Sequence, residues 1–301
     1  MNTFHKLIEQ AGLKEEVTVA VVKAEDREVL RAVEMATERE LANFILIGDE
    51  KKIDDLIAQE FPSLLQNGRV VTRHAVDAAA AAEKGVQAVR DKEAAVLMKG
   101  HIKTAPLLKA VLHKEKGMRT GNVLSHVALF EVPAIERSIF VTDAAMNVAP
   151  DLQQKVQIVA NAVNVAHKLG VSMPKVAPLA AVEVVNPGMQ ATLDAAALTQ
   201  MNRRGQITGC IVDGPLALDN AISIEAARQK NVGGEVAGQA DILLVSSIEA
   251  GNVLYKSLMY FGNSQVGAVI AGAKAPIVLT SRSDSAQSKL NSLAMAICSA
   301  N

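Results

Sequence analysis

Residues 276–297 read PIVLTSRSDSAQSKLNSLAMAI, a stretch in which a strand pattern changes to a helix pattern within a few residues. Ile277–Leu279 is a short apolar run directly after a proline, which predicts a short buried strand. From Ala286 to Ile297, apolar residues recur at the spacing of an amphipathic helix. Between the two, Ser281 to Ser285 place an arginine and a carboxylate among serines. A buried strand that passes through a polar loop into a helix is the repeating unit of an α/β protein.

The same alternation continues along most of the chain, with short joints marked by Gly, Pro or Asp. The predicted strands are Val17–Val22, Asn43–Ile47, Val70–Thr72, Ala94–Met98, Ser138–Thr142, Val176–Val184, Ile207–Asp213, Asp241–Ser246, Val266–Ala271 and Pro276–Thr280. The predicted helices are Glu25–Glu40, a stretch ending near Glu60, Ala75–Val89, Pro106–Lys114, Asp151–Leu169, Thr192–Arg203 and Val253–Tyr260. This order predicts the α/β class with a mainly parallel sheet. The 301 residues are enough for about two domains.

Composition excludes several classes of function. The chain has 31 basic and 32 acidic residues, so it lacks the basic excess typical of nucleic-acid partners. Neither a GxGxxG or Walker loop nor an HExxH pair is present, and Cys210 and Cys298 have no metal-like spacing, so no metal or nucleotide cofactor is predicted. No run of about 18 apolar residues predicts a membrane span, and the polar first 17 residues favour a cytoplasmic location.

Polar loops follow several predicted strands, where ligands of open α/β sheets bind. Lys99-Gly100-His101-Ile102-Lys103-Thr104 lies between a strand and a helix, and its cations and free N–H groups suit an anion. The alternative is that Thr104 only caps the helix and the lysines are solvated. Arg119 lies in another loop, and Arg282 suits bidentate binding of a phosphate unless it is a surface side chain.

Two further strand ends carry carboxylates. Asp213-Gly214-Pro215 reads most simply as a turn. After the strand Asp241–Ser246, Glu249 is either a first-turn acid or a functional group, and Asn252 is either a helix cap or a ligand-binding residue. Asp284 and Ser285 are likewise candidates to cap the last helix. Several anion-friendly loops without a metal site predict a phosphate-bearing small molecule as the ligand.

Five segments together carry a resemblance to a known family. They are LMKGHIKTAPLLKAVL (97–112), RTGNVLSHVALFEVP (119–133), DGPLALDNAIS (213–223), ADILLVSSIEAGNVLYKSL (240–258) and TSRSDSAQSKL (280–290). In this order they resemble the phosphate acetyltransferase/phosphate butyryltransferase family, and they look closest to its butyryltransferases.

The resemblance implies a fold and a reaction. The fold would be similar to isocitrate/isopropylmalate dehydrogenases, with two α/β domains and a cleft between them. Residues 1–130 plus 282–301 would form the first domain and 131–281 the second. The reaction would be butanoyl-CoA + phosphate ⇌ CoA + butanoyl phosphate, in a homo-oligomer without a cofactor, because CoA is a substrate. Acyl-CoA, phosphate and acyl phosphate are the implied partners, with neither nucleic acid nor membrane among them.

The resemblance also implies roles for residues. Ser281, Arg282 and Asp284 would be catalytic, with Asp284 as the base for the CoA thiol in a direct attack. The expected substrate-binding residues are Arg119, Lys99, His101, Thr104, Glu249 and Asn252. Two positions depart from the family pattern: Arg119 precedes Thr120 instead of a proline, and the spacing of the acetyltransferases' aspartate falls near Ser288.

Three other functions remain open on sequence grounds. The nearest is a phosphate acetyltransferase, which differs in acyl length alone. A dehydrogenase of the same fold is disfavoured, because no metal-binding aspartate cluster or nicotinamide motif is present. A non-catalytic ligand-binding protein of the same fold is disfavoured by the many polar residues at strand ends.

Overall fold

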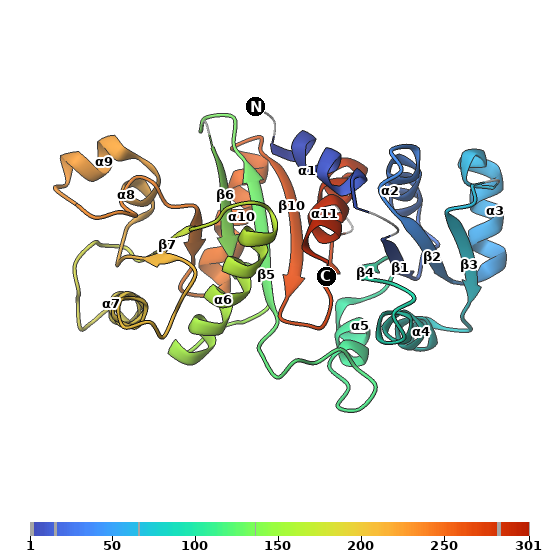
Figure 1. The fold of residues 1–301 in the computed structure, drawn as a ribbon, viewed down its shortest axis with the longest axis horizontal. Coiled ribbons are helices and arrows are strands. Elements are labelled where there is room, and N and C mark those ends of the chain that lie inside the picture. The colour runs from blue at the N-terminus through green and yellow to red at the C-terminus, as the bar shows by residue number, and fades with distance from the viewer. Residues whose placement is uncertain (1–2, 15–16, 66, 136, 282–283, 301) are drawn as a thin grey trace. The chain divides into compact units, whose positions relative to one another are not determined.

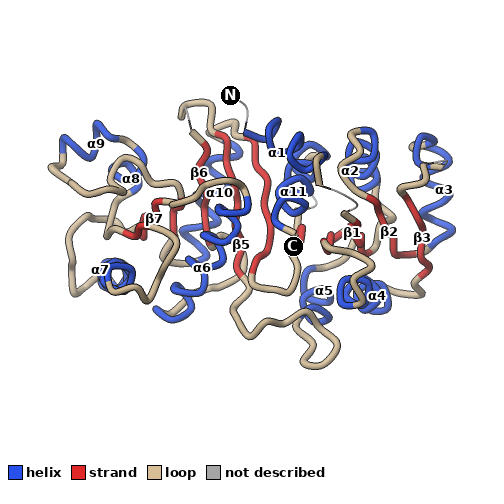
Figure 2. The backbone as a smooth tube through the Cα atoms, in the orientation of Figure 1, coloured by secondary structure: helices blue, strands red, loops and turns tan. Residues whose placement is uncertain are grey.

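The computed structural model describes residues 3–14, 17–65, 67–135, 137–281 and 284–300. The chain divides into two compact units: unit 1 comprises residues 1–122 and 267–301, and unit 2 comprises residues 123–266. Strands and helices alternate in each unit (Figures 1 and 2), which confirms the predicted α/β class. The predicted domain boundaries, at 130/131 and 281/282, stay predictions.

The sheet of unit 1 has the strand order β3-β2-β1-β4-β11-β10. Its strands are β1 (Thr18–Val22), β2 (Asn43–Gly48), β3 (Val70–His74), β4 (Val96–Lys99), β11 (Ile277–Val278) and β10 (Gln265–Ala271), which starts in the last two residues of unit 2. All neighbouring pairs are parallel except β10 and β11. The carboxyl ends of β1, β2, β3, β4 and β11 therefore lie at one edge of this sheet.

The helices of unit 1 are α1 (Thr3–Gly12), α2 (Arg27–Glu38), α3 (Glu50–Glu60), α4 (Ala78–Arg90), α5 (Thr104–Val111) and α11 (Ala286–Ser299), with a 3₁₀ turn at Pro62–Leu64. Helix α11 packs against α1, α2 and β11, and α1 lies beside it in Figure 1. Every residue from Ser288 to Cys298 is buried, so the helix is enclosed rather than half-exposed as an amphipathic pattern predicts. Ser292 in this buried stretch has two hydrogen bonds: its Oγ donates to the carbonyl of Ser288 and accepts from the N–H of Ala268.

Unit 2 has the strand order β5-β6-β9-β7-β8. Its strands are β5 (Ser125–Glu131), β6 (Ser138–Thr142), β7 (Lys175–Pro178), β8 (Ile211–Val212) and β9 (Ile242–Leu244). Strand β5 is antiparallel to β6, and the remaining pairs are parallel. The helices are α6 (Leu152–Lys168), α7 (Gln190–Arg203), α8 (Leu218–Ile222), α9 (Ile224–Gln229) and α10 (Ile248–Tyr260). The N-terminus of α6 has a capping box formed by Asp151 and Gln154, which satisfies two backbone donors.

The sequence prediction differs from these elements in several places. Helices α1, α8 and α9 and strand β5 were not predicted. The strand predicted at Val176–Val184 stops at Pro178, and beyond it Val184 is exposed. The strand predicted at Ile207–Asp213 is reduced to β8, and Gly209 before it has a positive φ of 74°, which the regular extended backbone of a strand does not have. No helix of the described residues is long and apolar enough to cross a membrane.

Candidate functional site

Two predicted loops lie at the same edge of unit 1 because their strands are neighbours. In the parallel pair of β4 and β11, Leu97 aligns with Ile277 and Met98 with Val278. The loop Lys99–Thr104 follows β4, and the turn Ser281–Asp284 comes shortly after β11. The carboxyl ends of parallel strands are where open α/β sheets bind ligands. The topology thus brings together the two segments that carry most of the predicted site residues.

Gly100 fixes the first of these loops against the end of β1. Its N–H donates to the carbonyl of Val22 at 2.8 Å, and the N–H of His101 donates to the carbonyl of Lys23 at 2.6 Å. A Cβ at Gly100 would lie 2.1 Å from the carbonyl oxygen of Lys23, a distance no side chain tolerates. The glycine in the sequence is therefore required for this close approach of two backbones.

His101 and Thr104 lie further along the same loop. The Nδ1 atom of His101 is 3.4 Å from Oδ2 of Asp26, the carboxylate that caps α2. Helix α5 begins at Thr104, and its N-cap is Lys103, which makes no side-chain capping bond. The alternative in which Thr104 only caps the helix is therefore wrong, because Thr104 is the first residue of the helix and Lys103 is its cap. The first-turn N–H groups of α5 are left to water or a ligand.

The turn Ser281–Asp284 is closed by its own carboxylate. The N–H of Ser281 donates to Oδ2 of Asp284 at 2.7 Å, and the N–H of Asp284 donates to the carbonyl of Ser281 at 3.2 Å. Ser285 is the N-cap of α11 and accepts from the N–H of Ser288. Arg282, the central residue of the predicted site, lies outside the described residues, as does Ser283.

Two buried lysines lie at this edge. Lys99, which is 6% exposed, donates from Nζ to the carbonyl of Gly100 at 3.4 Å. Lys289 is 3% exposed, and its Nζ donates to the backbone carbonyl of Asp284. For Lys289, the carbonyl solvates the ammonium group without neutralising it, and an uncompensated buried charge costs several kcal/mol. A bound anion would supply a counter-charge to Lys289.

Sequence reasoning named Lys99 but missed Lys289. The signal that could have found it is composition, since Lys289 is the single charged residue of α11. A lone lysine in a helix of small and apolar residues is more informative than one on a charged surface.

Arg119 lies at the other edge of the sheet of unit 1. Its backbone pairs with Ala273 in the turn before β11, and the N–H of Lys274 donates to the carbonyl of Met118 at 2.9 Å. Strand β11 runs from this turn towards Ser281. The backbone of Arg119 therefore lies near the start of β11, whereas the Ser281–Asp284 turn follows its end. The topology does not bring the backbone of Arg119 to the two loops.

Glu249 and Asn252 belong to unit 2, whereas the other predicted site residues belong to unit 1. Helix α10 begins at Ile248 after the N-cap Ser247, which accepts from the N–H of Ala250. Glu249 is an exposed first-turn acid, and hydrogen bonds from its own backbone N–H and from Ser247 lower the pKa of its carboxyl. Asn252 lies inside the helix rather than at its cap, because α10 starts five residues earlier than predicted.

The two cysteines are poor nucleophiles. Burial raises the pKa of the Cys210 thiol to about 11 and also raises the pKa of Cys298. Almost no thiolate is therefore present near neutral pH, and the thiolate is the reactive form. Within the described ranges, no three His, Cys, Asp or Glu side chains are placed to hold a metal ion.

Comparison with known proteins identifies the family. The family model described as phosphate acetyl/butaryl transferase matches residues 57–297. The chain belongs to this family. It is therefore an acyltransferase that uses an acyl-CoA and phosphate as substrates.

Named relatives occur on both sides of the family. The chain is 57% identical to a probable phosphate butyryltransferase of Bacillus subtilis, over 97% of this chain and 96% of the relative. It is 48% identical to a phosphate butyryltransferase of Clostridium acetobutylicum (98% and 97% covered). It is 42% identical to a phosphate acetyltransferase of Thermotoga maritima (96% and 97% covered).

Solved structures agree with the fold. A branched-chain phosphotransacylase from Enterococcus faecalis superposes with a TM-score of 0.83 at 38% identity, covering 94% of this chain and 98% of that one. A 4-hydroxythreonine-4-phosphate dehydrogenase from Klebsiella pneumoniae superposes with a TM-score of 0.57 at 11% identity, covering 94% and 100%. This second likeness shows the fold alone, and it agrees with the predicted dehydrogenase-like architecture.

Proposed function

We propose that the chain is a phosphate butyryltransferase, which transfers a butanoyl group reversibly between CoA and phosphate. The observation that carries this proposal is the convergence of the Lys99–Thr104 loop and the Ser281–Asp284 turn beside two buried lysines. This edge offers N–H groups and positive charge to a phosphoryl group. The butanoyl assignment is supported by the names of the two relatives that are 57% and 48% identical.

In this proposal phosphate binds at this edge of unit 1. In one direction the CoA thiol attacks the carbonyl of butanoyl phosphate and phosphate leaves; in the other direction phosphate attacks butanoyl-CoA and CoA leaves. Neither direction passes through a covalent enzyme intermediate. Arg282 holds phosphoryl oxygens in a bidentate manner, and the buried ammonium of Lys289 stabilises their charge from within the fold. Ser281 donates to the developing oxyanion, for which one donor contributes about 10²- to 10³-fold in rate. The high pKa values of Cys210 and Cys298 support direct transfer, because neither thiol is ready to accept an acyl group.

Asp284 is the proposed base for the CoA thiol. The ordinary pKa of a thiol is about 8.5, so a carboxylate that takes its proton contributes about 10²- to 10⁴-fold. Oδ2 of Asp284 accepts from the N–H of Ser281, a bond that orients the carboxylate and leaves Oδ1 to take the proton. His101, Thr104, Arg119, Glu249 and Asn252 stay substrate-binding predictions that rest on the resemblance, as do the homo-oligomeric state and the absence of a cofactor.

A thiol-release assay over a series of acyl-CoA substrates with phosphate tests the proposal. We expect kcat/KM to be highest for butanoyl-CoA or a branched acyl-CoA of similar size. A clear preference for acetyl-CoA would instead assign the chain to the phosphate acetyltransferases. No phosphate-dependent thiol release with any acyl-CoA would overturn the proposed activity.

Two variants test the residues. Arg282→Ala is expected to raise the apparent KM for phosphate and to lower kcat severely. Asp284→Asn is expected to lower kcat by about 10²-fold or more and to abolish the acidic limb of the pH–rate profile, because an amide cannot ionise. Wild-type kinetics in either variant would remove that residue from the mechanism.

A further inference from the structure

Unit 1 has a groove between α4 and α5, which lie side by side in Figure 1. The cavity measures about 910 Å³. Ala79, Ala105, Pro106 and Ala110 give it a floor of small apolar side chains. An apolar lining of this kind suits a flat, uncharged ring.

The groove leads away from the proposed phosphate site. Helix α5 starts directly after the Lys99–Thr104 loop, and α4 ends shortly before β4 begins, so both helices run from the carboxyl edge of the sheet to the amino edge. Pro106 lies at the end near the phosphate site, and Lys116 lies beyond the other end of α5. The eight residues of α5 span about 12 Å.

Positive charge gathers towards the far end. Arg90, Lys109 and Lys116 line the groove, and among the described residues none of their side chains makes an ion pair or a hydrogen bond. His113 also lines this end, and its Nδ1 accepts from the N–H groups of Glu115 and Lys116.

Two carboxylates line the same groove. Glu83 lies along α4, and Asp91 accepts from Nε2 of Gln87 at 3.3 Å. Three cations against these two carboxylates leave a positive excess, and the cations lie on three different segments: the end of α4, the middle of α5 and the loop after it.

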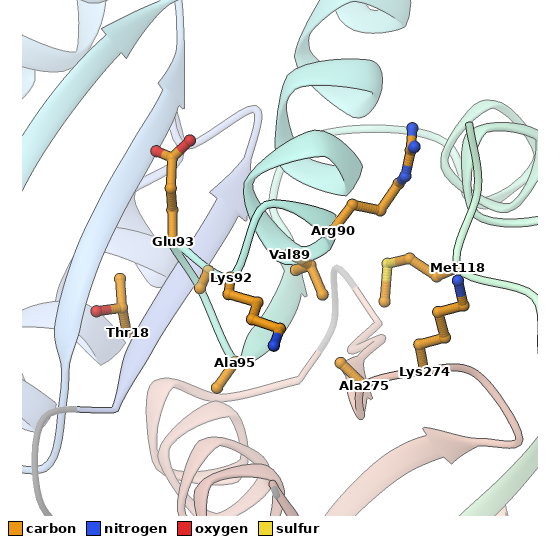
Figure 3. Close-up of a pocket in the computed structure, with 10 residues that line it drawn as sticks. Thr18, Val89, Arg90, Lys92, Glu93, Ala95, Met118, Lys274 and Ala275 are labelled. Atoms are coloured by element: carbon orange, nitrogen blue, oxygen red, sulfur yellow. The ribbon is translucent and has the colours of Figure 1, made fainter.

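A second cavity, of about 760 Å³, adjoins the amino ends of β1 and β4 and also includes Arg90 (Figure 3). Figure 3 shows the guanidinium of Arg90 extending away from the ammonium groups of Lys92 and Lys274. Lys92 follows the C-terminus of α4, where a cation is already favoured by the helix dipole. Arg90 lines both cavities, whereas Lys92 lines the second cavity and not the α4–α5 groove.

We propose that the α4–α5 groove binds the nucleotide end of coenzyme A, an inference that rests on the proposed function. The adenine would lie on the alanine and proline floor, and Arg90, Lys109 and Lys116 would bind the phosphates. The pantetheine arm spans about 15 Å, roughly the length of four to five extended residues. This matches the distance along α5 from the phosphate site to the far end of the groove.

The test compares two thioesters: butanoyl-CoA and S-butanoyl-pantetheine, which lacks the nucleotide. The variant is Lys109→Ala/Lys116→Ala, and Lys92→Ala is the matched control with the same loss of charge outside the groove. We expect the preference of the enzyme for butanoyl-CoA over the truncated thioester, as a ratio of kcat/KM values, to fall by about 10- to 100-fold in the double variant, the effect of losing one to two charge-assisted hydrogen bonds. The control should keep the wild-type ratio.

A binding measurement gives a readout that needs no turnover. Calorimetric titration with adenosine 3′,5′-bisphosphate should show binding to the wild type and to Lys92→Ala, with affinity at least about 10-fold weaker for the double variant. If butanoyl-CoA is turned over but the double variant keeps its full preference and its nucleotide affinity, the groove proposal is overturned. If no acyl-CoA is turned over at all, the proposed function fails, and the titration still decides whether the groove binds the nucleotide.

Discussion

Both units bury lysine side chains, and Lys155 of unit 2 differs from Lys289 of unit 1 in the partner of its ammonium group. In unit 2, Lys155 on α6 is 5% exposed, and its Nζ lies 2.5 Å from Oδ2 of Asp194 on α7. In unit 1, Lys289 on α11 is 3% exposed, and its Nζ donates to the backbone carbonyl of Asp284. One buried charge therefore has a carboxylate as its partner and the other a neutral oxygen.

This difference indicates that the charge of Lys155 stabilises the fold, whereas the charge of Lys289 is available to a bound ligand. The Lys155–Asp194 pair, which links α6 to α7, is neutral overall. Gln190 also donates to Oδ1 of Asp194, so both carboxylate oxygens of Asp194 accept a hydrogen bond from the protein. Among the described residues Lys289 forms no ion pair, so its charge is not neutralised within the fold as that of Lys155 is. An enzyme that binds phosphate gains from such a preorganised charge, because it does not have to be desolvated again during the reaction.

The largest expected effect is on stability, in unit 2. Lys155→Met leaves the carboxylate of Asp194 buried without its cation, which typically destabilises a protein by about 3–5 kcal/mol. Urea denaturation followed by circular dichroism measures this change. Lys230→Met is the matched control, because Lys230 pairs with Asp219 at 2.9 Å on the surface, and we expect little change there.

A double variant sharpens the same point. In Lys155→Met/Asp194→Leu the unpaired charge is removed, so most of the lost stability should return. If Lys155→Met alone is as stable as the wild type, the pair is not the structural ion pair that the geometry indicates.

The next effect is on activity, in unit 1. Lys289→Met is expected to lower kcat/KM for phosphate by about 10- to 100-fold, the contribution of a charge-assisted contact with the anion. Unfolding free energy should change by no more than about 1 kcal/mol, because relief of the buried charge offsets the lost bond to the carbonyl of Asp284. Lys51→Met, an exposed lysine of the same unit, is the control for both measurements.

The opposite pattern would contradict the comparison. If Lys289→Met unfolds as easily as Lys155→Met but keeps its catalytic constants, then Lys289 is a structural residue and the two units do not differ in this respect.

The sequence predicts this edge of unit 1 well because the signals there are local. Ile277–Leu279 and Ala94–Met98 are apolar runs, and Ser285 caps a helix that begins at the next residue. Parallel pairing then follows from the alternation of strands and helices. Local chemistry was sufficient to predict which loops follow which strands.

What depends on distant partners could not be predicted. The burial of Lys289 follows from the packing of α11 against α1 and α2, and the position of Arg119 follows from its pairing with Ala273, more than 150 residues later. The start of α10 was predicted too late because Ser247 caps it ahead of Gly251 and Asn252, two residues of low helix propensity. The α4–α5 groove likewise requires two helices whose charges are unremarkable when each is read alone.

The smallest expected effect concerns the cysteines, which are alike in the two units. Cys210 of unit 2 has its thiol pKa raised to about 11, about two units above an ordinary thiol, so near pH 8 its thiolate population is about 100-fold lower. In a Cys298→Ala background, alkylation of Cys210 by iodoacetamide at pH 8 should therefore be at least about 100-fold slower than that of a free thiol, and should recover in denaturant.

Cys210→Ala should keep wild-type turnover, because direct transfer needs no enzyme thiol. Rapid alkylation of the folded protein, or a burst of acyl-enzyme lost in Cys210→Ala, would instead show that a covalent intermediate forms in unit 2.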